Sequence, residues 1–177
     1  TETPDWPEVP DEPVGALLDP YRVNGKIHHY TGSSHTEEGH ITKDPSIIAD
    51  LNERLREKIE SRVDELSLVK SDLDDGADTL ILSYGISARS MEAAVNQLRA
   101  KGEKVSALTV YSLWPIPEKK ILEYLRDVKR IIIPEMNHGQ YRQEIERLTN
   151  GTIELVGVNR VDTFLITPEE IVEAYHG

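Results

Sequence analysis

Apolar positions from residue 79 onward alternate between short continuous runs and longer stretches with helical spacing. Four runs are apolar at nearly every position, as expected of strands covered on both faces. They span residues 79–83, 104–110, 130–134 and 153–158. Between them, apolar residues recur every three or four positions, which is the spacing of one helical face. This alternation predicts a three-layer α/β/α domain with a mostly parallel sheet.

The helices of this region have recognisable ends. Ser87 is the predicted N-cap of the first helix, and Gly102 is its C-terminal stop. Pro117 suits the first position of the second helix, and the third follows Gly139. The last begins at residues 167–170, where Thr-Pro-Glu-Glu predicts a capping box.

A different pattern precedes the α/β region. From residue 44, apolar residues recur with helical spacing, and charged side chains occupy the other faces. The apolar stripe consists of Ile48, Leu51, Leu55, Ile59, Val63, Leu66 and Val69. It predicts a long amphipathic connector helix over residues 44–72, which needs an apolar surface along one side. The α/β domain would then occupy residues 73–177.

Residues 1–43 are rich in Pro, Gly, Asp and Glu, which predicts an extended N-terminal arm. Within it we expect a short strand over residues 26–31, followed by a turn at residues 32–34. The arm also carries four histidines, His28, His29, His35 and His40. Their spacing matches no standard zinc motif, and histidines in such loops commonly bond the backbone, so we predict no metal site.

Composition narrows the classes of function. The formal net charge of -12 disfavours nucleic acid and anionic membrane surfaces as partners, because phosphate binding needs clustered Lys and Arg. No apolar run approaches the roughly 20 residues that span a bilayer. The absence of cysteine excludes disulfides, a catalytic thiol and thiolate-held iron–sulfur clusters on this chain. The chain begins at Thr1 without a signal peptide, so we expect a processed chain or excised piece of cytoplasmic origin.

Candidate chemistry is sought at the carboxyl ends of the strands, where doubly wound sheets bind ligands. After the first strand, Gly85, Ser87 and Arg89 form a glycine turn into a helix, whose free amides favour an anion. The spacing is neither that of a GxGxxG fingerprint nor that of a P-loop. The alternative is a tight turn that only begins the helix.

Two further segments follow the second and third strands. Trp114 lies in a proline-bounded loop, which favours packing or an interface over direct ligand contact. Glu135, Asn137, His138 and Gln140 share one loop, where Glu and His could form an acid/base pair. The same side chains could instead hold the loop or a neighbouring subunit. Without a nucleophile or metal nearby, we favour this structural role and assign no catalytic residue.

These segments together resemble a known family. ILSYGISAR at 81–89, LWPIP at 113–117 and EMNHGQ at 135–140 resemble the alpha subunit of 2-oxoacid:ferredoxin oxidoreductases, in its Rossmann-like, transketolase C-terminal-like domain. YTGSSHTEEGH at 30–40 resembles that family's connector, so the resemblance covers about residues 20–177. Related domains occur in transketolase, deoxyxylulose-phosphate synthase and 2-oxoacid dehydrogenase beta subunits, but the LWPIP loop favours the ferredoxin-linked branch. His138 departs from the family pattern, which more often has a small or aromatic residue there.

The resemblance implies an enzyme that oxidatively decarboxylates a 2-oxoacid with coenzyme A (CoA), giving an acyl-CoA, carbon dioxide and reduced ferredoxin. It implies thiamine diphosphate, magnesium and iron–sulfur clusters in the whole enzyme, but no cofactor on this chain. The implied partners are a beta and possibly gamma or delta subunits, with ferredoxin bound through the complex. The implied work of the domain is subunit assembly and shaping of the 2-oxoacid or CoA channel. Candidate ligand or subunit contacts are Gly85, Ser87, Arg89, Trp114, Glu135, Asn137 and Gln140.

Two alternatives remain open at this stage. The chain could be an independent module that binds CoA or a nucleotide at the helix start after Gly85. It could also be a purely structural assembly domain, in which Arg89 and Gln140 serve oligomerisation alone. A phosphoacceptor receiver domain shares the alternating pattern but needs an acidic pair where this chain has Tyr84 and Gly85. The residues that choose the 2-oxoacid are expected largely outside this chain.

Overall fold

The computed structural model describes residues 31–37 and 39–177, and the chain divides into two units, residues 1–62 and 63–177. In the described part of the first unit, His35 and Ile41 form an antiparallel bridge. Helix α1 (Pro45–Glu60) follows, and the Asp44 carboxylate accepts a 2.9 Å hydrogen bond from the Ser46 amide as its N-cap. The strand predicted at residues 26–31 lies, apart from its last residue, outside the described residues, as do His28 and His29.

The single helix predicted over residues 44–72 is wrong in its second half. α1 ends at Glu60, α2 (Val63–Leu66) is one turn long, and β1 (Val69–Asp72) is a strand. Distant hydrogen bonds override the helical spacing here. The Leu68 carbonyl accepts from the Tyr111 amide at 2.9 Å, and the Leu68 amide donates to the Ser112 hydroxyl at 3.0 Å. The second unit therefore begins at Val63, ten residues before the predicted domain start at 73.

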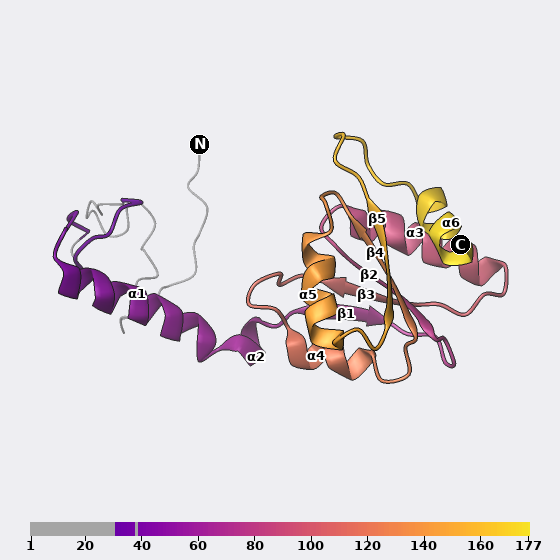
Figure 1. The fold of residues 1–177 in the computed structure, drawn as a ribbon, viewed down its shortest axis with the longest axis horizontal. Helices are drawn as coiled ribbons and strands as arrows, with labels where there is room; N and C mark the ends of the chain where they lie inside the picture. Colours follow the sequence, from indigo (N-terminus) through magenta and orange to yellow (C-terminus); the bar gives the residue numbers. More distant parts are fainter. Residues whose placement is uncertain (1–30, 38) are drawn as a thin grey trace, which may run out of the picture. The chain divides into compact units, whose positions relative to one another are not determined.

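The sheet of the second unit has the strand order β1-β3-β2-β4-β5 (Figure 1). β2 (Thr79–Tyr84), β3 (Ser106–Val110), β4 (Arg130–Glu135) and β5 (Glu154–Asn159) are parallel, and β1 pairs antiparallel with β3 at the edge. The four predicted strands are confirmed to within two residues at each end. The mostly parallel α/β class is confirmed as well, whereas β1 was not predicted.

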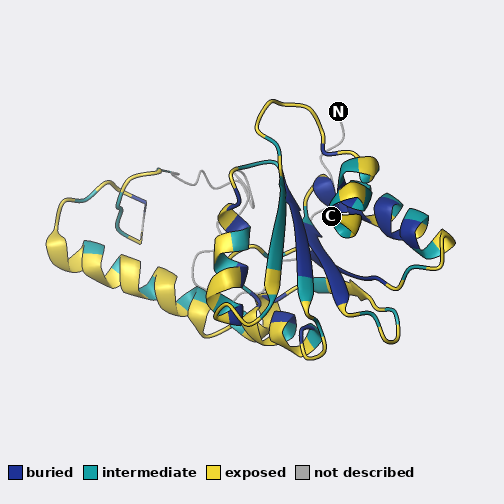
Figure 2. Cartoon of the chain, turned by 45° about the vertical axis from the view of Figure 1, so that its right-hand side comes forward, coloured by how far each residue is buried: buried dark blue, intermediate teal, exposed yellow. Residues whose placement is uncertain are grey.

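Helices cover both faces of this sheet, giving the three expected layers. α3 (Ser87–Ala100) and α6 (Pro168–His176) pack on one face, while α4 (Glu118–Tyr124) and α5 (Gln140–Thr149) pack on the other. Figure 2 shows the buried strands between the two helical layers. None of the helices in the described part of the chain is long and apolar enough to cross a membrane.

Successive side chains of the central strands point to opposite faces of the sheet and so contribute to both hydrophobic cores. Ile81 and Ile132 point toward the α3 and α6 side, while Leu80, Leu82 and Ile131 point toward the α4 and α5 side. All five side chains are fully buried. A strand that is apolar on both faces needs cover on both, which explains why the continuous apolar runs identified these strands in the sequence.

The helix ends differ from the sequence predictions at two positions. α3 starts at Ser87 itself after a helical Ile86, so the N-cap predicted at Ser87 is wrong, and no side chain caps this helix. Pro117 is the N-cap of α4 rather than its first residue. The capping box of α6 is confirmed: the Thr167 hydroxyl accepts from the Glu170 amide, and the Glu170 carboxylate accepts from the Thr167 amide at 2.7 Å.

Candidate functional site

The switch point of the sheet, which we define as residues 84–87 and 135–140, lies where two neighbouring strands send the chain in opposite directions. β2 and β4 are adjacent and parallel. β2 continues into α3 on one face of the sheet, and β4 continues into α5 on the other face. In open α/β sheets the crevice at such a point is the usual ligand site. Six of the seven candidate residues lie at this point or within the first turn of α3.

Glu135 is the centre of a hydrogen-bond network at the switch point. Its side chain is fully buried. One carboxylate oxygen accepts from the Tyr84 hydroxyl at 3.0 Å and from the Tyr141 amide at 2.8 Å. The other accepts from the Arg142 amide at 3.0 Å. Because these amides belong to the first turn of α5, the carboxylate satisfies donors that a helix start leaves free and lies at its positive end.

Asn137 completes the network. Its side-chain oxygen accepts from the amides of Gly139 and Gln140 at 2.8 and 3.0 Å, and its nitrogen donates to the Tyr84 hydroxyl at 2.7 Å. Its carbonyl accepts from the side chain of Asn159 at 3.0 Å. One asparagine thus ties the loop after β4 to the start of α5, to the end of β2 and to the end of β5.

Two tyrosines line this network. The rings of Tyr84 and Tyr141 meet edge to face, with centroids 5.4 Å apart. Burial, reinforced by the charge of Glu135, raises the pKa of Tyr84 to about 12. Burial also raises the pKa of Tyr141, whose hydroxyl has no hydrogen-bond partner among the described residues. Both phenols therefore stay protonated at neutral pH, and Tyr84 acts as a donor to Glu135.

The hydrogen bonds of Glu135 and Asn137 stabilise the loop after β4 rather than activate a reactive group. Both oxygens of Glu135 are engaged and shielded from water, and Asn137 uses both ends of its amide. His138 is exposed and makes no hydrogen bond with Glu135, so the acid/base pair considered from the sequence is not formed. A general base must reach the proton it removes, and the Glu135 carboxylate is enclosed by its own donors.

The turn from β2 into α3 is open by comparison. Gly85 has φ +57°, a left-handed conformation that favours glycine, and no atom lies within 4 Å of where a side chain would begin. No side chain caps α3. The Ser87 side chain is buried and Arg89 is exposed, and neither side chain has a hydrogen bond or ion pair among the described residues. The first amides of α3 therefore remain without a capping side chain, unlike those of α5.

The remaining two candidates contribute less to this network. Trp114 lies in the loop after β3, with 73% of its surface exposed, and takes no part in the network. Gln140 contributes its backbone amide, while its side chain is exposed. Tyr84 and Tyr141 were not predicted from the sequence as members of the site. Their positions, directly before Gly85 and directly after Gln140, were the available signal.

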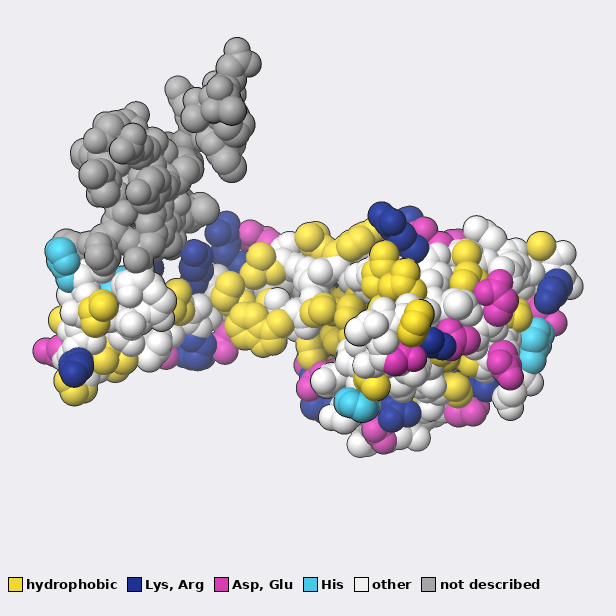
Figure 3. All heavy atoms as spheres, turned by 90° about the horizontal axis from the view of Figure 1, so that it is seen from above, with side chains coloured by type: hydrophobic (Ala, Val, Ile, Leu, Met, Phe, Trp, Pro, Cys, Tyr) yellow, Lys and Arg dark blue, Asp and Glu magenta, His cyan; other side chains and the backbone are white. Residues whose placement is uncertain are grey.

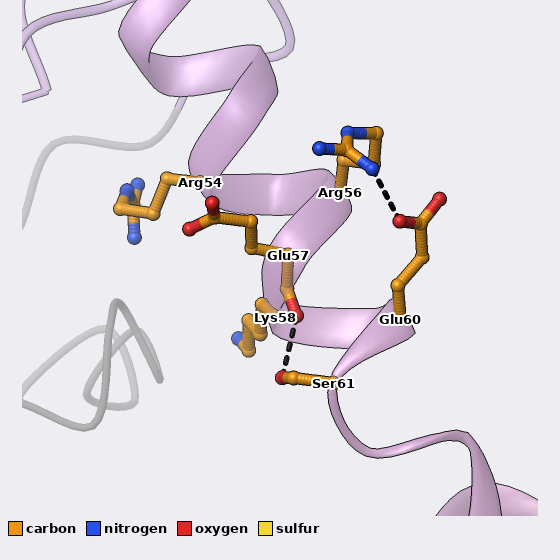
Figure 4. Close-up of a pocket in the computed structure, with 6 residues that line it drawn as sticks. All are labelled: Arg54, Arg56, Glu57, Lys58, Glu60 and Ser61. Carbon is orange, nitrogen blue, oxygen red and sulfur yellow. Dashed lines mark hydrogen bonds and ion pairs between the residues drawn. The ribbon is translucent and has the colours of Figure 1, made fainter.

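The described residues offer no candidate metal site. They contain no group of three His, Cys, Asp or Glu side chains that could hold a metal ion. His35 bonds the Ser33 carbonyl at 2.9 Å, as expected of a loop histidine. Figure 4 shows an open hollow along the last turns of α1, lined by Arg54, Arg56, Glu57, Lys58, Glu60 and Ser61. Arg56 pairs there with Glu60, and all six residues that line this hollow are charged or polar.

Comparison with known proteins agrees with the segments and the fold. Residues 77–171 match the family Pyruvate:ferredoxin oxidoreductase core domain II. The 2-oxoglutarate synthase subunit KorA of Methanothermobacter marburgensis is 30% identical over 163 residues, which cover 92% of this chain and 42% of that protein. This chain thus spans less than half the length of the curated relatives it matches.

Solved structures give the same picture. The 2-oxoglutarate:ferredoxin oxidoreductase from Magnetococcus marinus, solved with 2-oxoglutarate, coenzyme A and succinyl-CoA bound, superimposes with a TM-score of 0.65 at 26% identity. The match covers 86% of this chain and 27% of that one. A split-gene transketolase, solved as an inactive beta4 tetramer, shares the fold with a TM-score of 0.52 at 20% identity over 60% of this chain and 41% of its own. The chain belongs to the 2-oxoacid:ferredoxin oxidoreductase family, as a domain of an alpha-type subunit.

Proposed function

We propose that this domain supports subunit assembly in a 2-oxoacid:ferredoxin oxidoreductase and shapes the wall of its 2-oxoacid or CoA channel, while the reaction takes place elsewhere in the enzyme. That reaction would be the oxidative decarboxylation of a 2-oxoacid to an acyl-CoA, with reduction of ferredoxin. The partners would be the remaining parts and subunits of the same enzyme. The family name of the relatives supports the overall reaction.

The enclosed carboxylate at the switch point carries the proposal. Glu135 is the one charged side chain that is buried among the described residues of the switch point, and three hydrogen bonds occupy it. A site built this way keeps α5, β2 and β5 in register, and its buried carboxylate is occupied by the hydrogen bonds that hold the loop. Such rigidity suits a domain that presents fixed surfaces to its neighbours.

The cofactors implied by the family do not fit the residues present. Iron–sulfur clusters need thiolate ligands, and the chain has no cysteine. Magnesium that holds a diphosphate needs carboxylate or carbonyl ligands gathered at one place, and the described residues contain no such group of acidic side chains. We therefore assign thiamine diphosphate, magnesium and the clusters to other parts of the enzyme and route no step of the reaction through this chain.

Calorimetric titration of the isolated chain tests this proposal. We expect no heat of binding with thiamine diphosphate and magnesium, and none with a 2-oxoacid, but saturable binding to the remaining subunits of the cognate enzyme. Turnover of a 2-oxoacid by the chain alone, or tight binding of thiamine diphosphate, would contradict the assignment.

The uncapped start of α3 favours a second candidate function, the binding of an anionic group such as a phosphate of CoA. Free amides at a helix start, the open turn at Gly85 and the unpaired Arg89 are suited to an anion. The test is titration of the isolated chain with CoA. Binding that is lost in Arg89→Ala, but kept in Arg126→Ala, another exposed arginine, would make α3 part of the CoA channel. Absence of CoA binding would leave assembly as the function of the isolated domain.

A further inference from the structure

The largest apolar side chains of the α/β unit are on its surface rather than in its core. Trp114 is the one tryptophan and Phe164 the one phenylalanine among the described residues, and they are 73% and 69% exposed. Both cores are built from Leu, Ile, Val, Met and Ala, with Tyr141 as their one buried aromatic residue. The fold therefore does not need these two rings, although tryptophan and phenylalanine normally contribute most when buried.

The exposed apolar residues gather at one edge of the sheet. Seven of them, each directly after or within the loop that follows a parallel strand, define what we call the apolar edge. They are Ile86, Tyr111, Leu113, Trp114, Val161, Phe164 and Leu165. Since β2, β3 and β5 are parallel, these loops all emerge at the same edge. Figure 3, which views the molecule from above, shows hydrophobic side chains gathered on this side of the α/β unit.

The opposite edge gives an internal comparison. In its loops, Leu73 is the one large hydrophobic side chain among the described residues that is exposed. Exposed apolar residues scattered singly are ordinary on a soluble protein, but a concentration at one edge, including the largest rings, indicates a surface that another protein covers. Aromatic side chains dominate the binding energy of such interfaces.

Two arginines add charge to this edge. Arg89 lies in the first turn of α3, and Arg142 lies over Gly157 near the carboxyl end of β5. Neither guanidinium has an ion pair among the described residues, although the whole chain carries a net charge of -12. Aspartate or glutamate side chains of a partner could form ion pairs with both guanidinium groups. The surface that fits the apolar edge is thus itself apolar and carries carboxylates.

We propose that the apolar edge docks the portion of the oxidoreductase that the longer relatives carry beyond the matched stretch. This inference rests on the proposed function and specifies its surface. The chain spans 42% of the KorA relative and 27% of the Magnetococcus marinus chain, so in both proteins a larger portion of the same polypeptide lies beyond this domain. A second copy of this chain fits less well, because a two-fold contact would bring the same edge of both copies together, and its loop carboxylate, Asp162, already pairs with Arg160 rather than with Arg89 or Arg142.

Binding between the chain and the co-purified remainder of the cognate enzyme, which includes the portion that the longer relatives carry beyond the matched stretch, tests the proposal. Calorimetry would compare the wild type with Trp114→Ser, Phe164→Ser and the control Leu73→Ser, which removes a similarly exposed apolar side chain at the opposite edge. We expect each edge variant to bind at least tenfold more weakly, and Leu73→Ser to bind within twofold of the wild type. Far-UV circular dichroism checks folding, and because Trp114 and Phe164 lie in separate loops, one misfolded variant leaves the other informative.

The remaining outcomes overturn the proposal in distinguishable ways. If the wild type binds and both edge variants bind equally well, the interface lies elsewhere, while the assembly function stands. If the wild type does not bind the remaining subunits, the assembly function and this surface fail together. If light scattering shows a dimer of the isolated chain that Trp114→Ser and Phe164→Ser convert to monomer, the apolar edge belongs to a second copy.

Discussion

At the scale of single residues, the most consequential side chain is Glu135, a buried carboxylate with three donors and no access to water. Its two oxygens meet three donors: two are amides in the first turn of α5, and the third is a phenol that burial keeps protonated. A residue of this kind is conspicuous as a candidate catalyst, yet its geometry makes it a structural anchor.

Replacement of Glu135 by glutamine tests that role. Glu135→Gln keeps the shape but points an amide nitrogen at groups that are all donors, so at least one hydrogen bond is lost. We expect a loss of about 1–3 kcal/mol in the free energy of unfolding, measured in urea. Glu123→Gln, at an exposed position on α4, should change stability by less than about 0.5 kcal/mol. Equal stabilities of the two variants would show that the Glu135 network contributes nothing.

Tyr84 gives a prediction about pH. Its pKa in the folded chain, about 12, exceeds the value of about 10 for an unfolded tyrosine. Folding therefore favours the protonated phenol, and this contribution to stability is complete below about pH 10 and is lost as the pH rises through 12. Urea unfolding across this range should show a decline in stability that is shallower in Tyr84→Phe. Identical slopes for the two proteins would exclude Tyr84 as a source of the decline.

At the scale of helices and strands, the sequence predicted what is determined locally. Strands buried on both faces are continuous in apolar residues. The start of α6 was predictable because Thr167 and Glu170 form a capping box within four residues of sequence. β1 escaped prediction because only Val69 of its four residues is partly buried, and the strand exists through pairing with β3 and the ion pair of Asp72 with Arg99. Because these partners lie far away in the sequence, the spacing of apolar residues within 69–72 does not predict them.

Contacts between residues far apart in the sequence also limited the prediction of the candidate site. The segments around Gly85 and Glu135 were located, since the residues after parallel strands gather at one edge. The bond from Tyr84 to Glu135 was not foreseen, because it depends on β2 lying directly beside β4. Ser87 was taken for a cap because serine often is one, but Gly85 turns the chain one residue too early for its hydroxyl to do so.

The capping box of α6 is a prediction at this scale. Thr167→Ala removes the hydroxyl that accepts from the Glu170 amide. We expect a loss of about 1 kcal/mol in the free energy of unfolding, because α6 packs on the core beside α3. Thr167→Ser is the matched control, since it keeps the hydroxyl and should retain most of the stability. A loss as large in Thr167→Ser as in Thr167→Ala would mean that the methyl group, not the cap, matters.

At the scale of the whole molecule, the buried hydrophobic residues in the described part of the chain all lie in the second unit, from Leu80 to Ile171. Stability of the α/β unit should therefore not depend on residues 1–62. Trypsin can cut after Arg62, at the boundary between the units. A fragment of residues 63–177 should keep the melting temperature of the full chain to within about 3 °C, by calorimetry. Loss of cooperative melting in the fragment would show that the first unit completes the core.

We propose that this domain contributes surfaces to a 2-oxoacid:ferredoxin oxidoreductase and not reacting groups. The most direct test is 2-oxoacid-dependent reduction of ferredoxin by the remaining cognate subunits, measured without the chain, with the wild-type chain and with Glu135→Gln at saturating concentration. We expect turnover only when the chain is present, with the same kcat for wild type and Glu135→Gln. Full activity without the chain, or a bound Glu135→Gln chain that abolishes kcat, would contradict it.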